Sequence, residues 1–306
     1  MKPGEQNAIS LPFPSSNILY IIFNLIFLKK YRSGVYHITG HVHYAALALP
    51  KESTILTIHD LVFLNTYRGL RKLVMKWLFL DLPIKRVKWI TTVSEKTKQE
   101  IIHYCNCDPK KIIVIANPVD ALLQITNTEC ENLRPVLLFL GTKQNKNLEN
   151  TIPALFQLNI QLRIVGELTS EQQCLLEKYE LDYVALTNLD DDDLRREYYN
   201  CNIVLFPSFY EGFGLPIIEA FSAGKPVVTS SIAPMKDIAK DAAMYVNPHS
   251  ISSIRSAVQI LISNSDLRNE IILKGVEVVK KYNADLILDE YRSLWEKVMK
   301  RNIPAS

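Results

Sequence analysis

Two glutamates on either side of a glycine-containing turn are the residues of this chain best placed to bind a polar ligand. Glu211 and Glu219 have seven residues between them, and Gly214 lies in that interval. The apolar run 203–206 before the turn predicts a buried parallel strand, and Pro216 is typical of the first residues of a helix. A strand, a glycine turn and a helix N-terminus in this order direct backbone N–H groups and the positive end of a helix dipole at one spot, which suits a phosphate.

The spacing alone leaves a plainer interpretation open. Glu219 can be an acid in the first turn of a helix, where the dipole stabilises it, and Glu211 a solvated acid of a loop. Glycines also serve ordinary turns. By themselves, these residues indicate a phosphate-sized site without excluding a purely structural turn.

A second turn offers a positive charge. The apolar run 136–140 predicts a strand, and Gly141, Thr142 and Lys146 follow it before a predicted helix over 148–157. A lysine beside a helix N-terminus is electrostatically unfavourable, so a bound anion would explain its presence. The alternative is that Lys146 is a solvated lysine at the start of the helix.

Histidines gather in the first half of the chain. His59 follows the predicted strand 54–58, and ligands of open α/β sheets bind just beyond the carboxyl ends of strands. The alternative for His59 is a histidine hydrogen-bonded to backbone. His41 and His43 are expected to share one face of a strand, and neutral crevice histidines are a better interpretation of them and of His37 than a metal site. No Asp-x-Asp pair follows a suitable strand, so we expect no catalytic metal.

These residues lie on a regular alternation of predicted strands and helices, which indicates an α/β protein with parallel sheets in two Rossmann-like domains. We predict an N-terminal domain over 1–125, a C-terminal domain over 126–284, and a final helix over 285–306 that returns to the first domain. The polar stretch 119–134 is the expected linker. Further helices are predicted over 69–81, 95–104, 170–180, 190–200, 250–263 and 266–282, and further strands over 35–38, 89–93, 112–115, 162–166, 183–186, 225–229 and 242–246.

The composition is that of a folded globular protein. A length of 306 residues suits two domains, and 22% charged with 48% hydrophobic residues fits neither a disordered chain nor a polytopic membrane protein. The five cysteines include no Cys-x-x-Cys pair, which suits a reducing cytosol. We therefore expect a cytoplasmic protein.

Charge is distributed unevenly along the chain. Residues 1–130 hold 16 Lys and Arg against 9 Asp and Glu, and the remainder holds 19 against 23. The apolar stretch 18–28 predicts a helix over 17–32, and this stretch is shorter than the about 20 apolar residues that cross a membrane. Its apolar residues must be covered by protein or by lipid, so we expect peripheral contact with the inner face of a membrane. An ordinary solvated surface remains the explanation for most of the lysines, and no nucleic-acid partner is expected.

The stretch Glu-Gly-Phe-Gly-Leu-Pro over 211–216 resembles the donor-sugar motif of retaining glycosyltransferases of family 4. These enzymes adopt the GT-B fold, in which two Rossmann-like domains face a cleft. The turn 139–148 and the segments 57–61 and 93–98 resemble the same family. Its first domain normally opens with a strand, a glycine-rich turn and a helix, and nothing before Ile18 shows them. The resemblance therefore implies a GT-B protein whose N-terminal domain is reduced.

The resemblance implies a role for each residue of the central motif. Glu211 would accept hydrogen bonds from the hydroxyls of the donor sugar, and Glu219 from the ribose 2′- and 3′-hydroxyls. The backbone amides of Phe213, Gly214 and Leu215 would hold sugar and pyrophosphate oxygens.

The resemblance also assigns residues outside that motif. Lys146 would meet the nucleotide diphosphate in the turn that Gly141 opens, and His59 would face the sugar. Many family members have an arginine where Thr142 stands, so one phosphate contact is in question here. Lys143 is a candidate to replace it.

The implied reaction is a metal-independent transfer of a hexosyl-type sugar with retention of configuration. The donor is a nucleotide-diphosphate-sugar, which is a co-substrate, and no cofactor is expected. The acceptor would be a cell-surface polysaccharide or a lipid-linked glycan. The reduced first domain keeps one alternative open, a catalytically silent GT-B protein that binds a partner transferase, whereas a nucleotide-sugar epimerase fits the motif less well.

Overall fold

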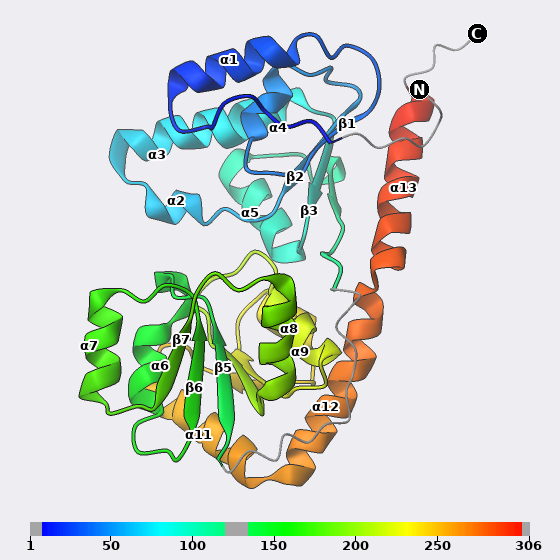
Figure 1. Cartoon of the computed structure of the whole chain (residues 1–306). Helices are drawn as coiled ribbons and strands as arrows, with labels where there is room; N and C mark the ends of the chain where they lie inside the picture. Colours follow the sequence, from blue (N-terminus) through cyan, green and yellow to red (C-terminus); the bar gives the residue numbers. More distant parts are fainter. Residues whose placement is uncertain (1–7, 120–133, 302–306) are drawn as a thin grey trace. The chain divides into compact units, whose positions relative to one another are not determined.

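The computed structural model describes residues 8–119 and 134–301, which fold as two compact units (Figure 1). The first unit comprises residues up to Ile115 together with the chain from Glu290 onward, and the second comprises 116–289. Each unit is built on one parallel sheet. The predicted linker 119–134 lies almost entirely outside the described residues.

The first unit has a four-stranded parallel sheet in the order β1-β2-β3-β4. Because the strands follow one another in sequence, each βα crossover advances by one position. Buried aliphatic side chains such as Leu56, Ile58 and Ile90 fill its core, and strand β2 is buried along its whole length. The bounds are β1 (Tyr36–Ile38), β2 (Thr54–Ile58), β3 (Trp89–Thr92) and β4 (Ile112–Val114).

Two helices of this unit differ from prediction. Helix α1 (Ile18–Leu28) begins after Asn17, whose side chain accepts from the Tyr20 amide at 3.0 Å, and it ends before the predicted residue 32. Its last turn tightens because the Lys29 amide bonds back to the Ile26 carbonyl at 3.2 Å. The predicted helix 69–81 runs on to Arg86 as three consecutive segments. The helical segments are η1 (His43–Leu47), α2 (Phe63–Thr66), α3 (Gly69–Lys76), the π-helical turn η2 (Trp77–Asp81), α4 (Leu82–Arg86), α5 (Glu95–Cys105) and η3 (Pro109–Lys111).

The predicted strand through His41 and His43 is wrong. His43 opens the 3-10 helix η1, and its imidazole is buried with Nδ1 2.9 Å from the Phe79 carbonyl oxygen. Four consecutive side chains, His43 to Ala46, are buried in η1, so burial does not alternate here as it would along a half-exposed strand. His41 is exposed, so the two side chains do not share a sheet face.

The second unit has a six-stranded parallel sheet in the order β10-β9-β8-β5-β6-β7. The chain starts in the middle at β5, proceeds outward to β7, and then returns to the other side of β5 with β8. Neighbouring strands β5 and β8 therefore carry crossovers that leave in opposite directions, a topological switch point. The bounds are β5 (Val136–Leu140), β6 (Gln161–Val165), β7 (Tyr183–Leu186), β8 (Ile203–Phe206), β9 (Val227–Ser230) and β10 (Met244–Val246).

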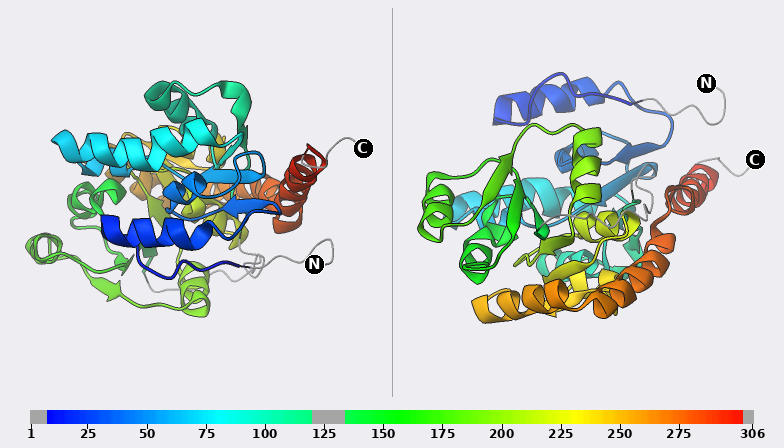
Figure 2. Two further views of the ribbon diagram at one scale, coloured as in Figure 1. Left: turned by 90° about the horizontal axis from the view of Figure 1, so that it is seen from above. Right: turned by 60° about the horizontal axis from the view of Figure 1, so that its bottom comes forward.

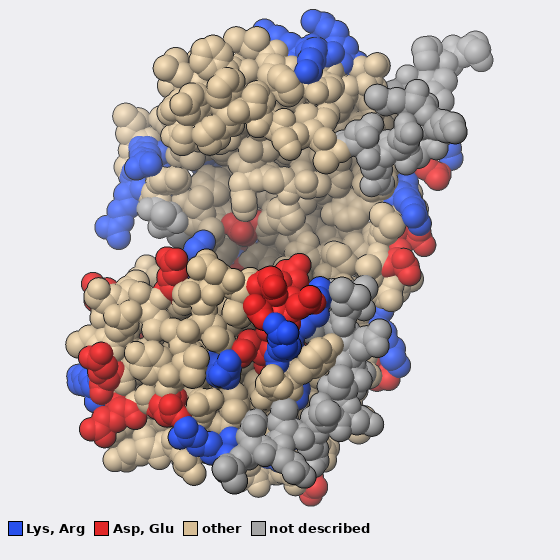
Figure 3. Space-filling model, viewed as in Figure 1, with Lys and Arg blue, Asp and Glu red and all other residues tan. Residues whose placement is uncertain are grey.

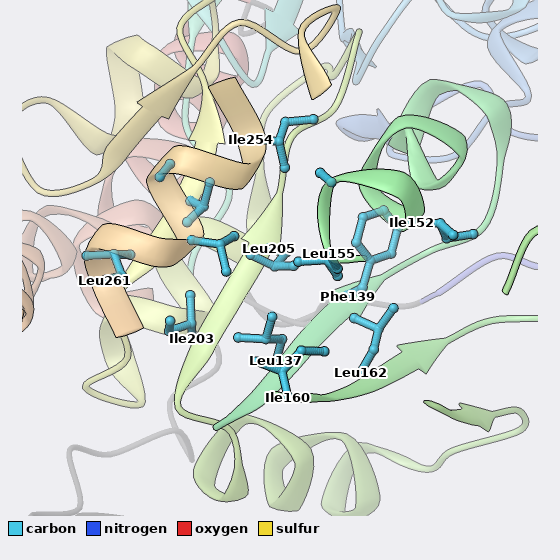
Figure 4. Packing of buried hydrophobic residues seen from close by; sticks show 14 of the residues in the cluster. Leu137, Phe139, Ile152, Leu155, Ile160, Leu162, Ile203, Leu205, Ile254 and Leu261 are labelled. Carbon is cyan, nitrogen blue, oxygen red and sulfur yellow. The ribbon is translucent and has the colours of Figure 1, made fainter. Parts of the chain in front are cut away.

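Helices cover both faces of this sheet. The core on one face is formed by α6, α7 and α11 against side chains such as Phe139, Leu162 and Leu205 (Figure 4). Helices α8, α9 and α10 pack on the other face. Helix α9 begins at Leu215, one residue before the predicted Pro216. The helical segments are η4 (Gln144–Lys146), α6 (Leu148–Ala154), α7 (Ser170–Lys178), α8 (Asp191–Asn200), α9 (Leu215–Ser222), α10 (Met235–Ala239), α11 (Ile251–Ser263), α12 (Ser265–Val279) and η5 (Lys280–Tyr282).

The last helix, α13 (Ala284–Arg301), belongs to the first unit from Glu290 onward. There it packs on a half-buried histidine of strand β1. Trp295 Nε1 donates to His37 Nδ1 at 3.3 Å, and His37 Nε2 lies 2.7 Å from Thr57 Oγ1. The Tyr291 ring lies 5.2 Å from the same imidazole. One histidine thus joins the helix to two strands.

This contact predicts acid sensitivity of the first unit. Burial lowers the pKa of His37 to about 4, with a smaller contribution from the charge of His59. The unfolded chain therefore takes up the proton first as the pH falls, and stability that is complete above about pH 6.5 is lost progressively down to about pH 4, by on the order of 3 kcal/mol. We expect urea titrations to show a shallower loss of stability with falling pH in His37→Gln than in the wild type. The exposed His103→Gln serves as control, and an unchanged pH slope in His37→Gln would contradict the assignment.

Candidate functional site

The candidate site lies at the carboxyl ends of β5 and β8, the strands on either side of the switch point. The loop after β5 carries Gly141, Thr142 and Lys146, and the loop after β8 carries Glu211 and the start of α9. Because parallel neighbours end at the same edge, the two turns singled out from the sequence become adjacent. The sheet order, which the sequence did not show, is what brings them together.

Gly141 allows the first loop to fold over its own lysine. Its φ of +86° is a conformation that residues with a side chain rarely adopt. A Cβ at this position would lie 3.1 Å from Cγ and Cε of Lys146. The lysine stem therefore crosses directly over the glycine, and its ammonium is carried toward the second loop.

Lys146 and Glu211 form an ion pair, with Nζ 2.8 Å from Oε1. The side chains are only 21% and 13% exposed, so water screens the pair less than it would at the surface. The Lys146 ammonium also lies 4.8 Å from the centre of the Phe206 ring at the end of β8, which favours the cation. The two charged residues predicted to contact different parts of one ligand thus contact each other.

Asn145 fastens the two loops together. Its carbonyl accepts from the Phe209 amide at 2.8 Å, and its side-chain amide donates to the Tyr210 carbonyl at 3.0 Å. The same amide approaches Glu211 Oε1 at 3.5 Å. These bonds fix the position of the carboxylate relative to the lysine.

Glu219 lies beyond the first turn of α9, so the interpretation of it as a first-turn acid is wrong. Its Oε2 accepts from the Tyr198 hydroxyl at 2.6 Å, and Tyr198 is fully buried on α8. Burial, and after it the Glu219 charge, raises the pKa of Tyr198 well above its usual range. The phenol therefore stays a donor at neutral pH. Nothing in the sequence near Glu219 signals Tyr198, because α8 and α9 meet only through the packing of the sheet.

The start of α9 presents backbone to the same edge. Gly214 has φ +130° and holds the N-cap position, and within the part of the chain that the structure describes no side chain caps the helix. Leu215 is 38% exposed, whereas Phe213 is buried with its ring 5.7 Å from that of Tyr282. Amides of an uncapped first turn need an outside acceptor, and an anion can serve as one.

Thr142 is used within the protein. Its hydroxyl donates to the Glu167 carbonyl at 2.6 Å, and its main-chain carbonyl accepts from Gln172 Nε2 at 2.8 Å. Gly166 leaves room for this contact, since a Cβ there would lie 3.0 Å from the threonine side chain. The hydroxyl thus joins the loops after β5 and β6. Lys143 is exposed beside it.

His59 lies in the first unit, where its Nε2 is 2.8 Å from the Thr39 carbonyl. This is the backbone-bonded arrangement that was the alternative for this residue. Its ring centre is 6.2 Å from that of His41, which is 6.3 Å from that of His43. Burial lowers the pKa of His43 to about 4, so this imidazole is neutral. Among the described residues, no group of histidine, cysteine or acidic side chains is arranged to hold a metal ion.

Two family models match the chain. The model "Glycosyl transferases group 1" matches residues 128–278, which include the whole candidate site of the second unit, and "Glycosyltransferase Family 4" matches residues 4–121. The chain belongs to the group 1 glycosyltransferases. Its two parallel-sheet domains are those of the GT-B fold, and the first has four strands where the second has six.

Curated relatives and solved structures agree with this family. The O-antigen chain mannosyltransferase RfbU of Salmonella typhimurium is 31% identical over 75% of this chain and 65% of the relative. The O-antigen chain mannosyltransferase B of Escherichia coli is 27% identical over 84% of this chain and 72% of the relative. The crystal structure of HepE from Anabaena in complex with UDP and glucose superposes with a TM-score of 0.79 at 15% identity, covering 91% of this chain and 82% of that one. The chain thus spans about two thirds of the first relative's length, and the likeness to HepE shows the fold.

The bond between Tyr198 and Glu219 predicts a measurable contribution to stability. In Tyr198→Phe the half-buried carboxylate loses a charge-assisted donor, which should lower the free energy of unfolding by about 2 kcal/mol. Urea denaturation checks this, with Tyr183→Phe on β7 as the matched control. Equal stability of Tyr198→Phe and the wild type would show that the bond is not formed in solution.

Proposed function

We propose that this chain transfers a hexosyl group from a nucleotide-diphosphate-sugar to a cell-surface polysaccharide or a lipid-linked glycan, with retention of configuration. The observation that carries the proposal is the Lys146–Glu211 pair, held at the switch point beside an uncapped helix N-terminus. The names of the relatives support it, since two act on O-antigen chains and HepE was crystallised with UDP and glucose.

The pair gives a physical account of donor binding. A diphosphate competes with Glu211 for the Lys146 ammonium, and the amides at the start of α9 supply further donors. The carboxylate displaced from the lysine can then accept hydrogen bonds from sugar hydroxyls. Because each ion gains a new partner as it loses the old one, neither half-buried charge is left uncompensated.

Glu219 suits the ribose. A carboxylate has about four lone-pair sites, and the bond from Tyr198 uses one of them while fixing the orientation of the group. Two vicinal hydroxyls can donate to a carboxylate oriented in this way. His59 is proposed to contact the transferred sugar, with its ring oriented by the bond to the Thr39 carbonyl.

The transfer itself demands stabilisation of a departing diphosphate. The bond between the anomeric carbon and the phosphate oxygen breaks, the acceptor oxygen bonds to the same face of that carbon, and the acceptor proton passes to the departing phosphate. Lys146 and the α9 amides stabilise the charge that develops on the leaving oxygens, which is the main electrostatic requirement of the step. With these cationic and amide donors, we propose that the reaction proceeds without a metal ion.

Loss of the ion pair should abolish transfer without unfolding the protein. Lys146→Met and Glu211→Gln are expected to lower kcat by at least about 100-fold, the usual effect of removing one donor that stabilises developing charge. The measurement is nucleotide release from UDP-, GDP- and ADP-sugars, after a thermal-shift screen selects the donor. Lys274→Met, which breaks the exposed pair with Glu270 on α12, is the control and should keep full activity.

A different result would favour a silent binding subunit. If the wild type and both variants bind no nucleotide-sugar in the thermal-shift screen while a partner transferase co-purifies, the enzyme proposal fails. Donor binding by the wild type that is lost in Lys146→Met supports the assigned site even before an acceptor is known.

A further inference from the structure

The first unit exposes an apolar surface on two of its helices. Nine large apolar side chains are between 44% and 76% exposed, and three of them line a shallow groove at the end of α3. We refer to these nine as the apolar surface. Its members are Ile18, Leu19, Ile22, Phe23 and Ile26 on α1, and Leu70, Leu73, Val74 and Trp77 on α3 and η2.

Helix α1 exposes five apolar side chains, whereas its buried face includes the polar residue Asn24. Asn24 is completely buried, and its amide donates to the Phe13 carbonyl at 2.9 Å and to the Tyr44 hydroxyl at 2.9 Å. Its Oδ1 accepts from the Phe13 amide at 3.2 Å. Three bonds to one side chain fix the rotation of the helix about its axis. An ordinary surface helix has the reverse arrangement, with its polar face in water.

The two parts of the apolar surface are neighbours. Tyr44 of η1 bonds to Asn24 on α1, and its ring lies 5.6 Å from that of Phe79 in η2. Helix α1 packs on η1, and η1 packs on η2, which continues α3, so η1 lies between the two parts of the surface (Figures 1 and 2). Isolated apolar side chains are normal on a protein surface, whereas a contiguous group of this size marks an interaction site.

The charges around this surface are mostly positive, with Asp81 beside Lys76 at the groove. Residues 8–51 and 61–80 contain no Asp or Glu. Figure 3 shows the first unit with basic side chains at the margins of a broad uncharged area. Among the described residues two of these cations pair with acids, Lys51 with Glu52 and Lys76 with Asp81. The basic residues of these ranges are Lys29, Lys30, Arg32, Lys51, Arg68, Arg71, Lys72 and Lys76.

An apolar area with a basic margin matches an anionic lipid surface. Helix α1 has 11 residues, or about 16 Å, against a hydrocarbon core of about 30 Å. In 8–119 and 134–301 no helix is long and apolar enough to cross a membrane. A second copy of the chain fits less well, because a twofold contact would bring the two basic margins together. We propose that α1 and α3 bind the surface of a bilayer that contains anionic phospholipids, with their apolar side chains inserted at the headgroup boundary.

Vesicle co-sedimentation of the full chain tests this without donor or acceptor. The chain should sediment with phosphatidylcholine vesicles that contain about 30% phosphatidylglycerol, and much less with phosphatidylcholine alone. Emission from the exposed Trp77 should shift to shorter wavelength on binding, and Trp77→Phe should remove most of the shift. Arg71→Gln with Lys72→Gln should weaken partitioning about 25-fold, or roughly fivefold for each charge.

The apolar contribution is tested by Ile22→Ser with Phe23→Ser, whose side chains face outward and whose loss should leave the fold intact. This pair should also reduce binding, whereas Leu273→Ser and Lys281→Gln, exposed on the second unit, should not. The proposal is overturned if the folded wild type ignores anionic vesicles, or binds neutral vesicles equally well. It is also overturned if size-exclusion chromatography shows a dimer that the α1 variants dissociate while vesicles are not bound.

Discussion

The reversal of strand order beside β5 is the constraint on which the rest of the second unit depends. Because the chain enters its sheet in the middle, the loops after β5 and β8 leave toward opposite faces and cannot fill the space between them. That space is lined by backbone and by the side chains nearest the strand ends. In that space Lys146 from the loop after β5 faces Glu211 from the loop after β8.

Both acids of the site have a partner within the protein before a ligand binds. Glu211 is balanced by a cation and Glu219 by the hydroxyl of Tyr198. A half-buried carboxylate without such partners would be destabilising, so the protein stays folded before substrate arrives. The two acids differ in what a ligand must do. At Glu211 it must replace a full charge, whereas at Glu219 it can add to a neutral donor.

The sequence predicted most strands well, but it did not reveal contacts between residues that lie far apart in the chain. The strand 136–140 was predicted to the residue, because an apolar run without a polar break fits a covered parallel sheet. The edge strand 183–186 was also predicted to the residue, although its side chains are only partly buried. The motif around 211–219 and the turn at Gly141 indicated two halves of a site, but their adjacency depends on the sheet order. Tyr198 was missed since its role comes from another helix. The strand through His43 was wrongly predicted, because this segment forms a 3-10 helix in which four consecutive side chains are buried.

The close packing of Lys146 on Gly141 restricts how this loop can change during evolution. Asparagine at 141 would relieve the demand for a positive φ, yet its Cβ would still meet the lysine stem at 3.1 Å. A side chain at 141 therefore requires the Lys146 stem to shift by a few tenths of an ångström, which would move its ammonium relative to Glu211. The two positions are therefore coupled, because a side chain at 141 alters the placement of the charge at 146. A homologue without glycine at 141 is thus expected to hold the cation of this loop differently.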